Sequence, residues 1–240
     1  MIIKKTNNFT YVNTDNVKLH PNLDIAVVPV PQSKEKIILI KDVFQNPYEI
    51  RDLLSLSPIH KEPILGFPGY RSSLRYSFGE LPTFVAYLLK EYYCFDATAT
   101  FCHMNVIVPQ VKVRKRSIVP HVDDMDFGYS IWLNTPDEIK RYPGTAFYKN
   151  KELNSCTLNC KNEEQYDEYL EKYYIPAADE NEFCDFDSTN IDKNVWDPYF
   201  ISEMRFNSMI LYPGSLFHQP FIKPHFFPEC ERISLSGVAK

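Results

Sequence analysis

Glycine is scarce in this chain of 240 residues, which has seven glycines against eighteen prolines. That balance predicts stiff loops rather than long flexible linkers. Long hydrophobic runs are also lacking, because no stretch approaches the roughly 20 apolar residues of a transmembrane helix. The N-terminal segment MIIKKTNNF has no apolar core of the kind that a secretory signal needs. We therefore expect a cytoplasmic protein with no membrane partner.

An excess of positive charge is lacking too, since the formal net charge is −5. This charge argues against a nucleic acid held by bulk electrostatic attraction. Without a secretory signal, the six cysteines are expected to be reduced and mostly buried rather than joined in disulfides. The alternative is a zinc site made by Cys156, Cys160 and Cys184, although no fourth ligand stands at a usual spacing from them.

Hydrophobic residues make up 44% of the chain and aromatic residues 15%, which suits a substantial sheet-rich core. Apolar runs at 25–30 and 37–40 predict strands. A helix is predicted after Asn46, with Glu49 placed to complete a capping box. A second helix is predicted from Pro82, where apolar residues recur at helical spacing and form a stripe that packs on the core.

The order of these patterns predicts one domain over residues 1–240. Residues 1–97 are expected to form an α/β support, and residues 98–240 a core of strands. The segment 57–80 has no clear period and predicts an irregular connection that either binds a ligand or only braces the fold. Residues 150–203 are expected to be an insertion in the core, either a lid that excludes water or a helix covering one sheet edge.

His121 and Asp123 form a His-x-Asp pair in a segment expected to be extended. Side chains alternate along a strand, so the two residues project to one side and can hold one ion. Asp124 would point the other way. A distant histidine completes the set, and we favour His218, which follows an ordered strand, over His225 in a proline-rich loop. Two imidazoles and one carboxylate form the facial set of non-haem Fe(II) sites, which leaves open positions on the metal.

Arg232 and Ser234 share one face of the last predicted strand. An arginine directed into the interior needs an anionic partner, because burying its charge alone is costly. Its planar fork matches a carboxylate, and a neighbouring hydroxyl can add a hydrogen bond. Asn105, on an earlier strand, is expected to face the same interior.

The ordered set of His-x-Asp, distal His and Arg-x-Ser resembles the 2-oxoglutarate/Fe(II)-dependent oxygenase superfamily. Further stretches carry the resemblance, namely IVPHVDD, YSIWLN, GTAFY and MILYPGSLFHQP. The chain is most similar to the prolyl-hydroxylase-like branch and its small bacterial or viral relatives. The resemblance implies a double-stranded β-helix (jelly roll), mainly β within an α+β fold, with the N-terminal segment as its α/β support.

By the same resemblance, His121, Asp123 and His218 would bind Fe(II). Arg232 and Ser234 would bind the distal carboxylate of 2-oxoglutarate, and Asn105 would face this cosubstrate. The prolyl hydroxylases generally have lysine where Arg232 stands, so their substrate does not carry over. Because the triad keeps its carboxylate, hydroxylation or desaturation fits better than halogenation.

The substrate is expected to be an amino acid, a peptide or a small metabolite. The basic segment 112–116, the segment 57–80 and the acidic insertion would border the opening, so that it carries both signs of charge. Two other classes remain open: a non-catalytic jelly-roll module that binds a metal or ligand, and a zinc hydrolase with the same His/Asp/His set. Neither needs the carboxylate anchor that Arg232 would provide.

Overall fold

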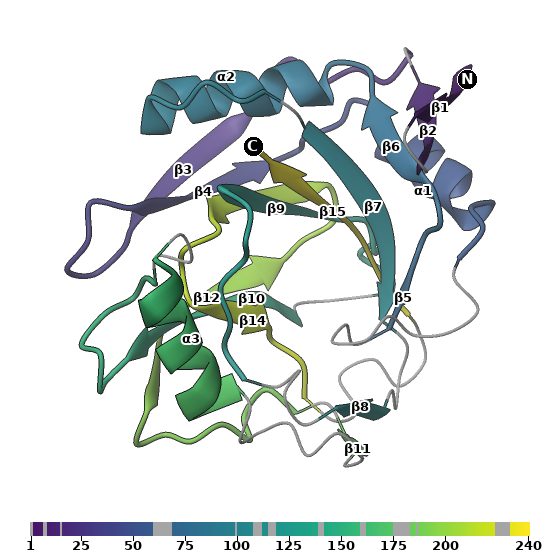
Figure 1. The fold of residues 1–240 in the computed structure, drawn as a ribbon. Helices are drawn as coiled ribbons and strands as arrows, with labels where there is room; N and C mark the ends of the chain where they lie inside the picture. The colour runs from purple at the N-terminus through teal and green to yellow at the C-terminus, as the bar shows by residue number, and fades with distance from the viewer. Residues whose placement is uncertain are drawn as a thin grey trace.

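The computed structural model describes residues 2–6, 9–14, 16–59, 69–98, 100–107, 112–114, 119–138, 142–158, 162–174, 183–185, 187–223 and 231–240. Within these ranges the chain is mainly β, with sheets built largely from antiparallel strands (Figure 1). The helical elements are α1 (Pro47–Ser55), α2 (Leu81–Tyr93), α3 (Glu163–Tyr169) and the π-helical turn η2 (Leu170–Tyr174). The expected mainly β fold is therefore confirmed.

The larger sheet has the strand order β1-β2-β6-β7-β15-β9-β13-β4-β3, and β5 also pairs with β7. Among its described pairings only β2 and β6 run parallel. The N-terminal segment therefore supplies both edges of the larger sheet, with β1 and β2 at one edge and β3 and β4 at the other. The strands are β1 (Ile2–Thr6), β2 (Phe9–Thr14), β3 (Asp24–Pro29), β4 (Lys36–Lys41), β5 (Tyr70–Arg71), β6 (Arg75–Phe78), β7 (Thr100–Ile107), β9 (Phe127–Trp132), β13 (Ser208–Pro213) and β15 (Arg232–Ala239).

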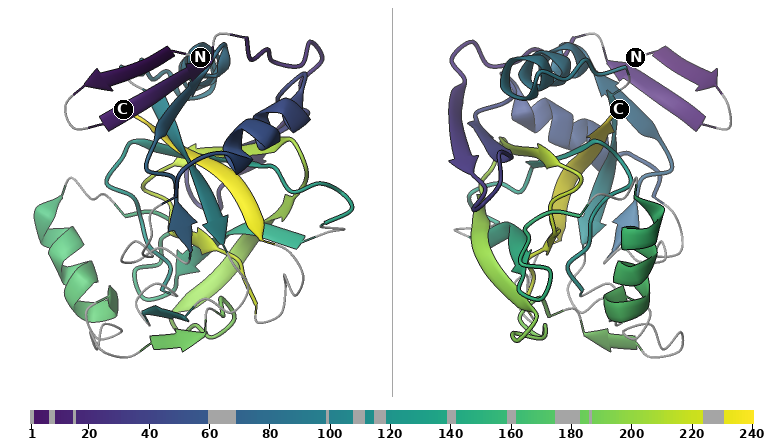
Figure 2. Two further views of the ribbon diagram at one scale, coloured as in Figure 1. Left: turned by 90° about the vertical axis from the view of Figure 1, so that its right-hand side faces the viewer. Right: turned by 60° about the vertical axis from the view of Figure 1, so that its left-hand side comes forward.

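A smaller sheet of β12, β10 and β14 faces the larger one, so the two form a β sandwich (Figures 1 and 2). Its strands are β10 (Tyr142–Asn150), β12 (Trp196–Met204) and β14 (His218–Pro220). A separate two-stranded ribbon joins β8 (Lys112–Arg114) to β11 (Phe183–Asp185).

Alternation along the strands of the larger sheet gives it two apolar faces. Ile38 and Leu211 belong to the core on the outer face, whereas Ile37 and Ile210 belong to the core between the sheets. Phe147 of β10 is fully buried in that inner core. A side chain on the inner face of the larger sheet is therefore directed toward the small sheet.

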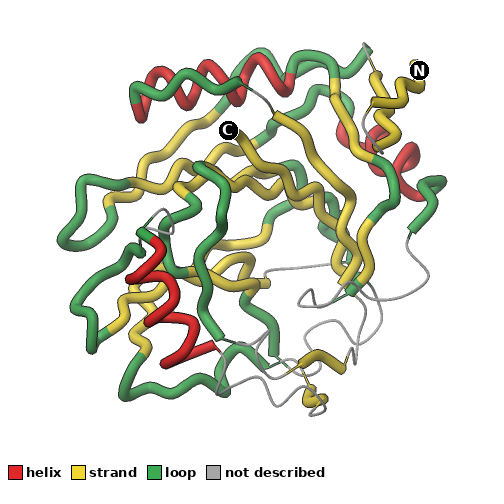
Figure 3. Tube along the Cα trace, viewed as in Figure 1, coloured by secondary structure: helices red, strands yellow, loops and turns green. Residues whose placement is uncertain are grey.

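Helices α1 and α2 cover the outer face, where Ile50, Leu54, Val85 and Leu88 are buried in the outer core. Figure 3 shows both helices at the end of the molecule opposite α3. The apolar stripe expected after Pro82 is thus confirmed as core. These helices stabilise the sheet from behind and leave its inner face to the site.

Two local predictions are wrong. Within the described chain the side chain of Asn46 accepts no capping hydrogen bond, so the expected capping box does not form. Pro47 still starts α1, because its fixed φ suits the first helical turn and its missing N–H has no helical partner to lose. In the segment 57–80, Arg75–Phe78 forms β6, because β2 and β7 supply pairing partners that no local pattern reveals.

The expected insertion is shorter than 150–203, because β12 pairs with β10 as part of the small sheet. The helical segment within it is anchored: Tyr169 is buried, and its hydroxyl donates to the Pro120 carbonyl at 2.6 Å. Whether this segment moves as a lid stays a prediction.

Among the described cysteines, Cys94, Cys102 and Cys156 carry free thiols, and Cys102 and Cys156 are buried. Cys160 and the side chain of Cys184 fall outside the described residues, and so does the alternative zinc site. In the part of the chain that the structure describes, no helix has the length and apolarity needed to cross a membrane.

Candidate metal centre

His121 and His218 lie side by side through an isolated antiparallel bridge. The amide of His121 donates to the carbonyl of His218 at 2.9 Å, and the reciprocal bond is 2.8 Å. Their rings are 4.6 Å apart between centroids. Two histidines that are distant in the sequence are thus held by backbone bonds, which orient both side chains before any ligand binds.

Asp123 follows in an extended loop rather than in a regular strand. Its amide donates to the Gly214 carbonyl at 2.8 Å, and Val122 between the two candidate ligands is buried on the opposite side. A Cβ at Gly128 would lie 3.2 Å from Oδ2 of Asp123, and one at Gly214 would lie 3.2 Å from its Cβ and 2.0 Å from the Met125 carbonyl oxygen. Gly128 therefore makes room for the carboxylate, and Gly214 makes room for the Met125 backbone and for the Cβ of Asp123.

Each of the three residues offers a ligand atom, and these atoms all lie within 4.8 Å of one another. Nε2 of His218 is 3.5 Å from Oδ2 of Asp123. Donors that bind one ion at about 2.1 Å are separated by about 3 to 4 Å, so the set has the scale of a metal site. A small inward movement of the side chains would complete it.

Hydrogen bonds assign the ring nitrogens. Nδ1 of His218 lies 2.8 Å from the Leu216 carbonyl oxygen. A carbonyl can only accept, so Nδ1 carries a proton, and Nε2 is the ring nitrogen that faces Asp123. The ring of His121 bonds to the backbone of Val119, while burial and the neighbouring His218 lower its pKa to about 4, partly offset by Asp123. A neutral imidazole is the form that binds a metal.

The choice among candidates follows from this geometry. Asp123 lies with both histidines, whereas Asp124 is exposed and does not belong to the group. His225 falls outside the described residues, so the structure does not compare it with His218.

Tyr212, which the sequence reasoning missed, lies against the group. Its ring centroid is 4.7 Å from that of His218 and 5.1 Å from that of Phe147. Burial raises the pKa of Tyr212 well above its usual value; Asp123 raises it further and Arg232 lowers it. Its hydroxyl therefore keeps its proton, within electrostatic reach of both Asp123 and Arg232. Its place directly before the Pro-Gly turn was the one signal available in the sequence.

Arg232 is buried at the start of β15, with only 4% of its surface exposed. Nη1 donates to the Gly144 carbonyl of the small sheet at 3.4 Å, while Nε has no hydrogen-bond partner among the described residues. In that same part of the chain no carboxylate forms an ion pair with it. Burial lowers its pKa to about 10, and Tyr212 opposes this shift. Arg232 thus stays charged near neutral pH.

Ser234 and Asn105 lie opposite each other in the pairing of β15 with β7, and both are buried. Oδ1 of Asn105 accepts a hydrogen bond from Nε of Arg71 at 2.9 Å, whereas its Nδ2 has no partner within the described ranges. The three predicted anchors therefore lie on the wall of the larger sheet that faces β10. Arg71, from the segment 57–80 that was expected either to bind a ligand or to brace the fold, joins them.

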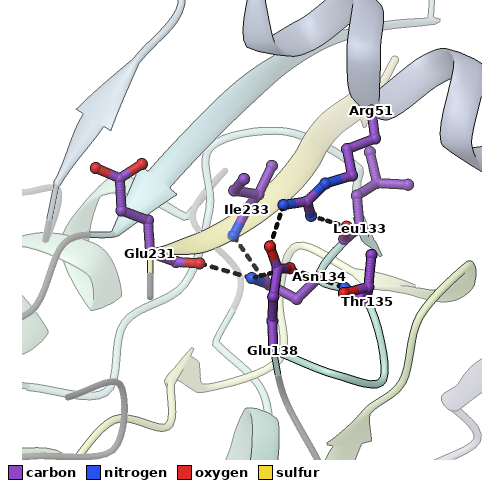
Figure 4. Close-up of polar contacts among 7 residues, drawn as sticks. All are labelled: Arg51, Leu133, Asn134, Thr135, Glu138, Glu231 and Ile233. Atoms are coloured by element: carbon purple, nitrogen blue, oxygen red, sulfur yellow. Dashed lines mark hydrogen bonds and ion pairs between the residues drawn. The ribbon is translucent and has the colours of Figure 1, made fainter. Parts of the chain in front are cut away.

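Asn134 fixes the backbone on either side of Arg232 (Figure 4). Its Oδ1 accepts from the Ile233 amide at 2.7 Å, and its Nδ2 donates to the Glu231 carbonyl at 2.6 Å. Glu138 accepts from the Thr135 amide at 2.9 Å and from Asn134 at 3.4 Å.

Arg51 of α1 ties this corner to the outer helices. It pairs with Glu138 and donates from Nη1 to the Leu133 carbonyl at 2.5 Å (Figure 4). The pair is mostly shielded from solvent, with side-chain exposures of 19% and 29%. Asn134, which holds the start of β15 around Arg232, is therefore itself tied to α1 through Glu138 and Arg51.

Fold and site together define a mainly β sandwich protein with an internal group of two histidines and one aspartate able to hold a metal ion. More particularly, the chain belongs to the family described as "Family of unknown function (DUF6445)", which matches residues 21–229. No curated protein matches the chain.

Proposed function

We propose that this protein is an Fe(II)- and 2-oxoglutarate-dependent oxygenase that hydroxylates an amino acid, a peptide or a small metabolite. His121, Asp123 and His218 would hold the iron, and Arg232 with Ser234 would bind the distal carboxylate of 2-oxoglutarate. Asn105 would face the cosubstrate. We also propose that the β sandwich is a distorted jelly roll of the double-stranded β-helix type, because its two facing sheets enclose these residues.

The donor set supports iron as the metal. Two neutral imidazoles and one carboxylate supply three ligands and leave further positions free, as non-haem Fe(II) oxygenases require. The hydrogen bond between Nδ1 of His218 and the Leu216 carbonyl leaves Nε2, the nitrogen that faces Asp123, for the metal. When bound, iron with 2-oxoglutarate and oxygen would supply the oxidising chemistry.

One observation carries the proposal beyond a metal site, namely the charge of Arg232. A buried guanidinium without an anion is costly, and the described residues offer it one long hydrogen bond to a carbonyl. A carboxylate bound beside it would satisfy both its charge and Nε. A zinc hydrolase or a non-catalytic metal module has no need for this second anchor.

The surrounding side chains would orient the cosubstrate and exclude water. Tyr212 keeps its proton and can donate a hydrogen bond to a cosubstrate bound near Asp123 and Arg232. Phe147 and Trp132, both nearly fully buried, close the space between the sheets. A dry site strengthens the charge interactions that Arg232 provides.

The test has two parts. Anaerobic titration should show about one Fe(II) per chain, lost when His121, Asp123 or His218 is changed singly to alanine. His20→Ala, outside the group, serves as the control. Succinate release from 2-oxoglutarate should then depend on Fe(II), oxygen and one member of a panel of amino acids, peptides and metabolites.

Competing outcomes are distinguishable. Retained iron binding in His218→Ala would show that another histidine is the ligand. Tight Zn(II) binding without any measurable affinity for 2-oxoglutarate would favour the hydrolase or the binding module and overturn the proposal.

A further inference from the structure

Trp132 carries an unsatisfied polar atom in the core between the two sheets. It lies on β9 with its side chain in the inner core, together with Phe147, and only 1% of its surface is exposed. Its indole Nε1 is buried and has no hydrogen-bond partner among the residues that the structure describes. An indole nitrogen can only donate. Because a buried donor without an acceptor costs free energy and is rare in native proteins, this position calls for an acceptor.

Trp132 and Arg232 converge on Gly144 in the small sheet. Nη1 of Arg232 donates to the Gly144 carbonyl at 3.4 Å. A Cβ added to Gly144 would lie 2.5 Å from Cζ2 and 3.1 Å from Cε2 of Trp132, so the indole approaches closely because residue 144 has no side chain. Cε2 is the ring carbon bonded to Nε1. The indole N–H and the guanidinium therefore both lie next to Gly144.

Strand pairing places the same two groups on one wall of the larger sheet. Trp132 lies opposite Ser234 between β9 and β15, and Ser234 lies opposite Asn105 between β15 and β7. Arg232 precedes Ser234 by two positions on β15 and so shares its face. Within the described ranges, Nδ2 of the buried Asn105 and Nε of Arg232 also have no hydrogen-bond partner. Three neighbouring strands thus present buried, unpartnered donors toward the small sheet.

This set of donors favours a carboxylate. Water could accept a hydrogen bond from each donor, but it could not offset the buried charge of Arg232. A carboxylate has two oxygens that accept from several donors and carries the opposite charge. A ligand can also enter, because the side chain of Asp123 keeps 31% of its surface exposed. Tyr212 lies within electrostatic reach of both Asp123 and Arg232, which places this opening near the wall of donors.

We propose that Trp132 is a further binding residue of the cosubstrate site, whose Nε1 donates to one oxygen of the distal carboxylate while Arg232 binds the other. The carboxylate is then held from two strands, so its orientation is selected as well as its charge. A 2-oxo acid that ends in a methyl group leaves both donors unsatisfied and is rejected. The identity of the ligand as 2-oxoglutarate rests on the proposed function, whereas the binding of a carboxylate by Trp132 does not.

The indole N–H signals give a direct readout, because the chain has only two tryptophans. Zn(II)-loaded protein is titrated at constant ionic strength and followed by proton–nitrogen correlation NMR. The probes are 2-oxoglutarate, glutarate, which lacks the oxo group, and 2-oxopentanoate, which has a methyl group in place of the distal carboxylate. The indole proton of Trp132 should move downfield and saturate with both dicarboxylates but not with 2-oxopentanoate. Trp196, which packs in a different core cluster with Tyr169, should not respond.

Variants separate hydrogen bonding from packing. Trp132→Phe keeps an aromatic ring in the core and removes the N–H. It should weaken 2-oxoglutarate binding by about tenfold, as expected on losing a hydrogen bond to a charged group. The affinities for 2-oxopentanoate and for Zn(II), measured by calorimetry, should not change, whereas a purely structural role would weaken both oxo acids alike. Trp196→Phe is the matched control, since Trp196 is also buried, and should leave all three affinities unchanged.

The outcomes separate this inference from the proposed function. Binding of 2-oxoglutarate without a downfield shift of the Trp132 indole proton would overturn the inference alone, and this result needs no variant that has to fold. An equal loss of affinity for both oxo acids in Trp132→Phe, or no saturable shift with any probe, would overturn it too. A saturable shift with glutarate in a protein that has no measurable affinity for 2-oxoglutarate would support the role of Trp132 and overturn only the proposed function.

Discussion

Asn134→Ala tests how the fold places Arg232. Asn134 is 3% exposed and makes one hydrogen bond to the backbone on each side of the arginine. Alanine removes both bonds without touching Arg232, the candidate metal ligands or the sheet pairing of β15. The change therefore separates the position of the arginine from its chemistry.

The magnitude follows from the two groups left behind. A buried polar group without a partner costs about 1–3 kcal/mol. Glu231 is exposed, so water can bond to its carbonyl once the Asn134 side chain is removed. Ile233 is half-buried, so water reaches its amide less easily and the lost hydrogen bond costs more free energy there. We expect the free energy of unfolding to fall by about 2 kcal/mol, near the middle of the range for one such group.

Two measurements check this prediction. Urea denaturation of the metal-free protein gives the stability change, and calorimetry of the Zn(II)-loaded protein gives the affinity for 2-oxoglutarate. That affinity should fall by about tenfold, or 1.4 kcal/mol, while Zn(II) binding stays the same. Asn194→Ala, an exposed asparagine, is the control and should change neither quantity. A stability loss without any change in 2-oxoglutarate affinity would refute the claim that Asn134 positions Arg232.

Three further predictions concern single side chains. Arg232→Lys should weaken 2-oxoglutarate binding by about 1–2 kcal/mol, because a point charge cannot replace a two-pronged fork; Zn(II) affinity, measured in parallel, should not change. Gly128→Ala should weaken Zn(II) binding, because the added methyl group would lie 3.2 Å from Oδ2 of Asp123, and an unchanged affinity would contradict this close approach. Burial and nearby arginines lower the pKa of His103 to about 4 in the folded protein. As the pH drops from about 6.5 toward 4, the unfolded chain takes up a proton at this residue while the folded protein stays neutral there. The free energy of unfolding of the metal-free protein should therefore fall over this range. Arg75→Gln should raise the pKa of His103, as an NMR titration would show, and reduce the loss of stability at low pH.

Periodicity was sufficient to predict much of the scaffold. The apolar stripe of α2 and the buried strand near 37–40 are visible locally, because each buries a repeating set of side chains on one face. The failures have a different origin. β6 forms because β2 and β7 lie on either side of it, and β12 is a core strand because β10 accepts its pairing. A partner strand that lies far away in the sequence cannot be inferred from a short window of residues.

The candidate site divides in the same way. Sequence by itself determined which residue types could form it: His121 and Asp123 have the spacing that puts two side chains on one side of an extended segment, and Arg232 has an obligatory charge. Tertiary structure alone decided which distant groups meet them, through the His121–His218 bridge and the approach of Tyr212. The physical reason is that alternation along one strand is a local property, whereas contact between strands depends on backbone pairing over the whole sheet.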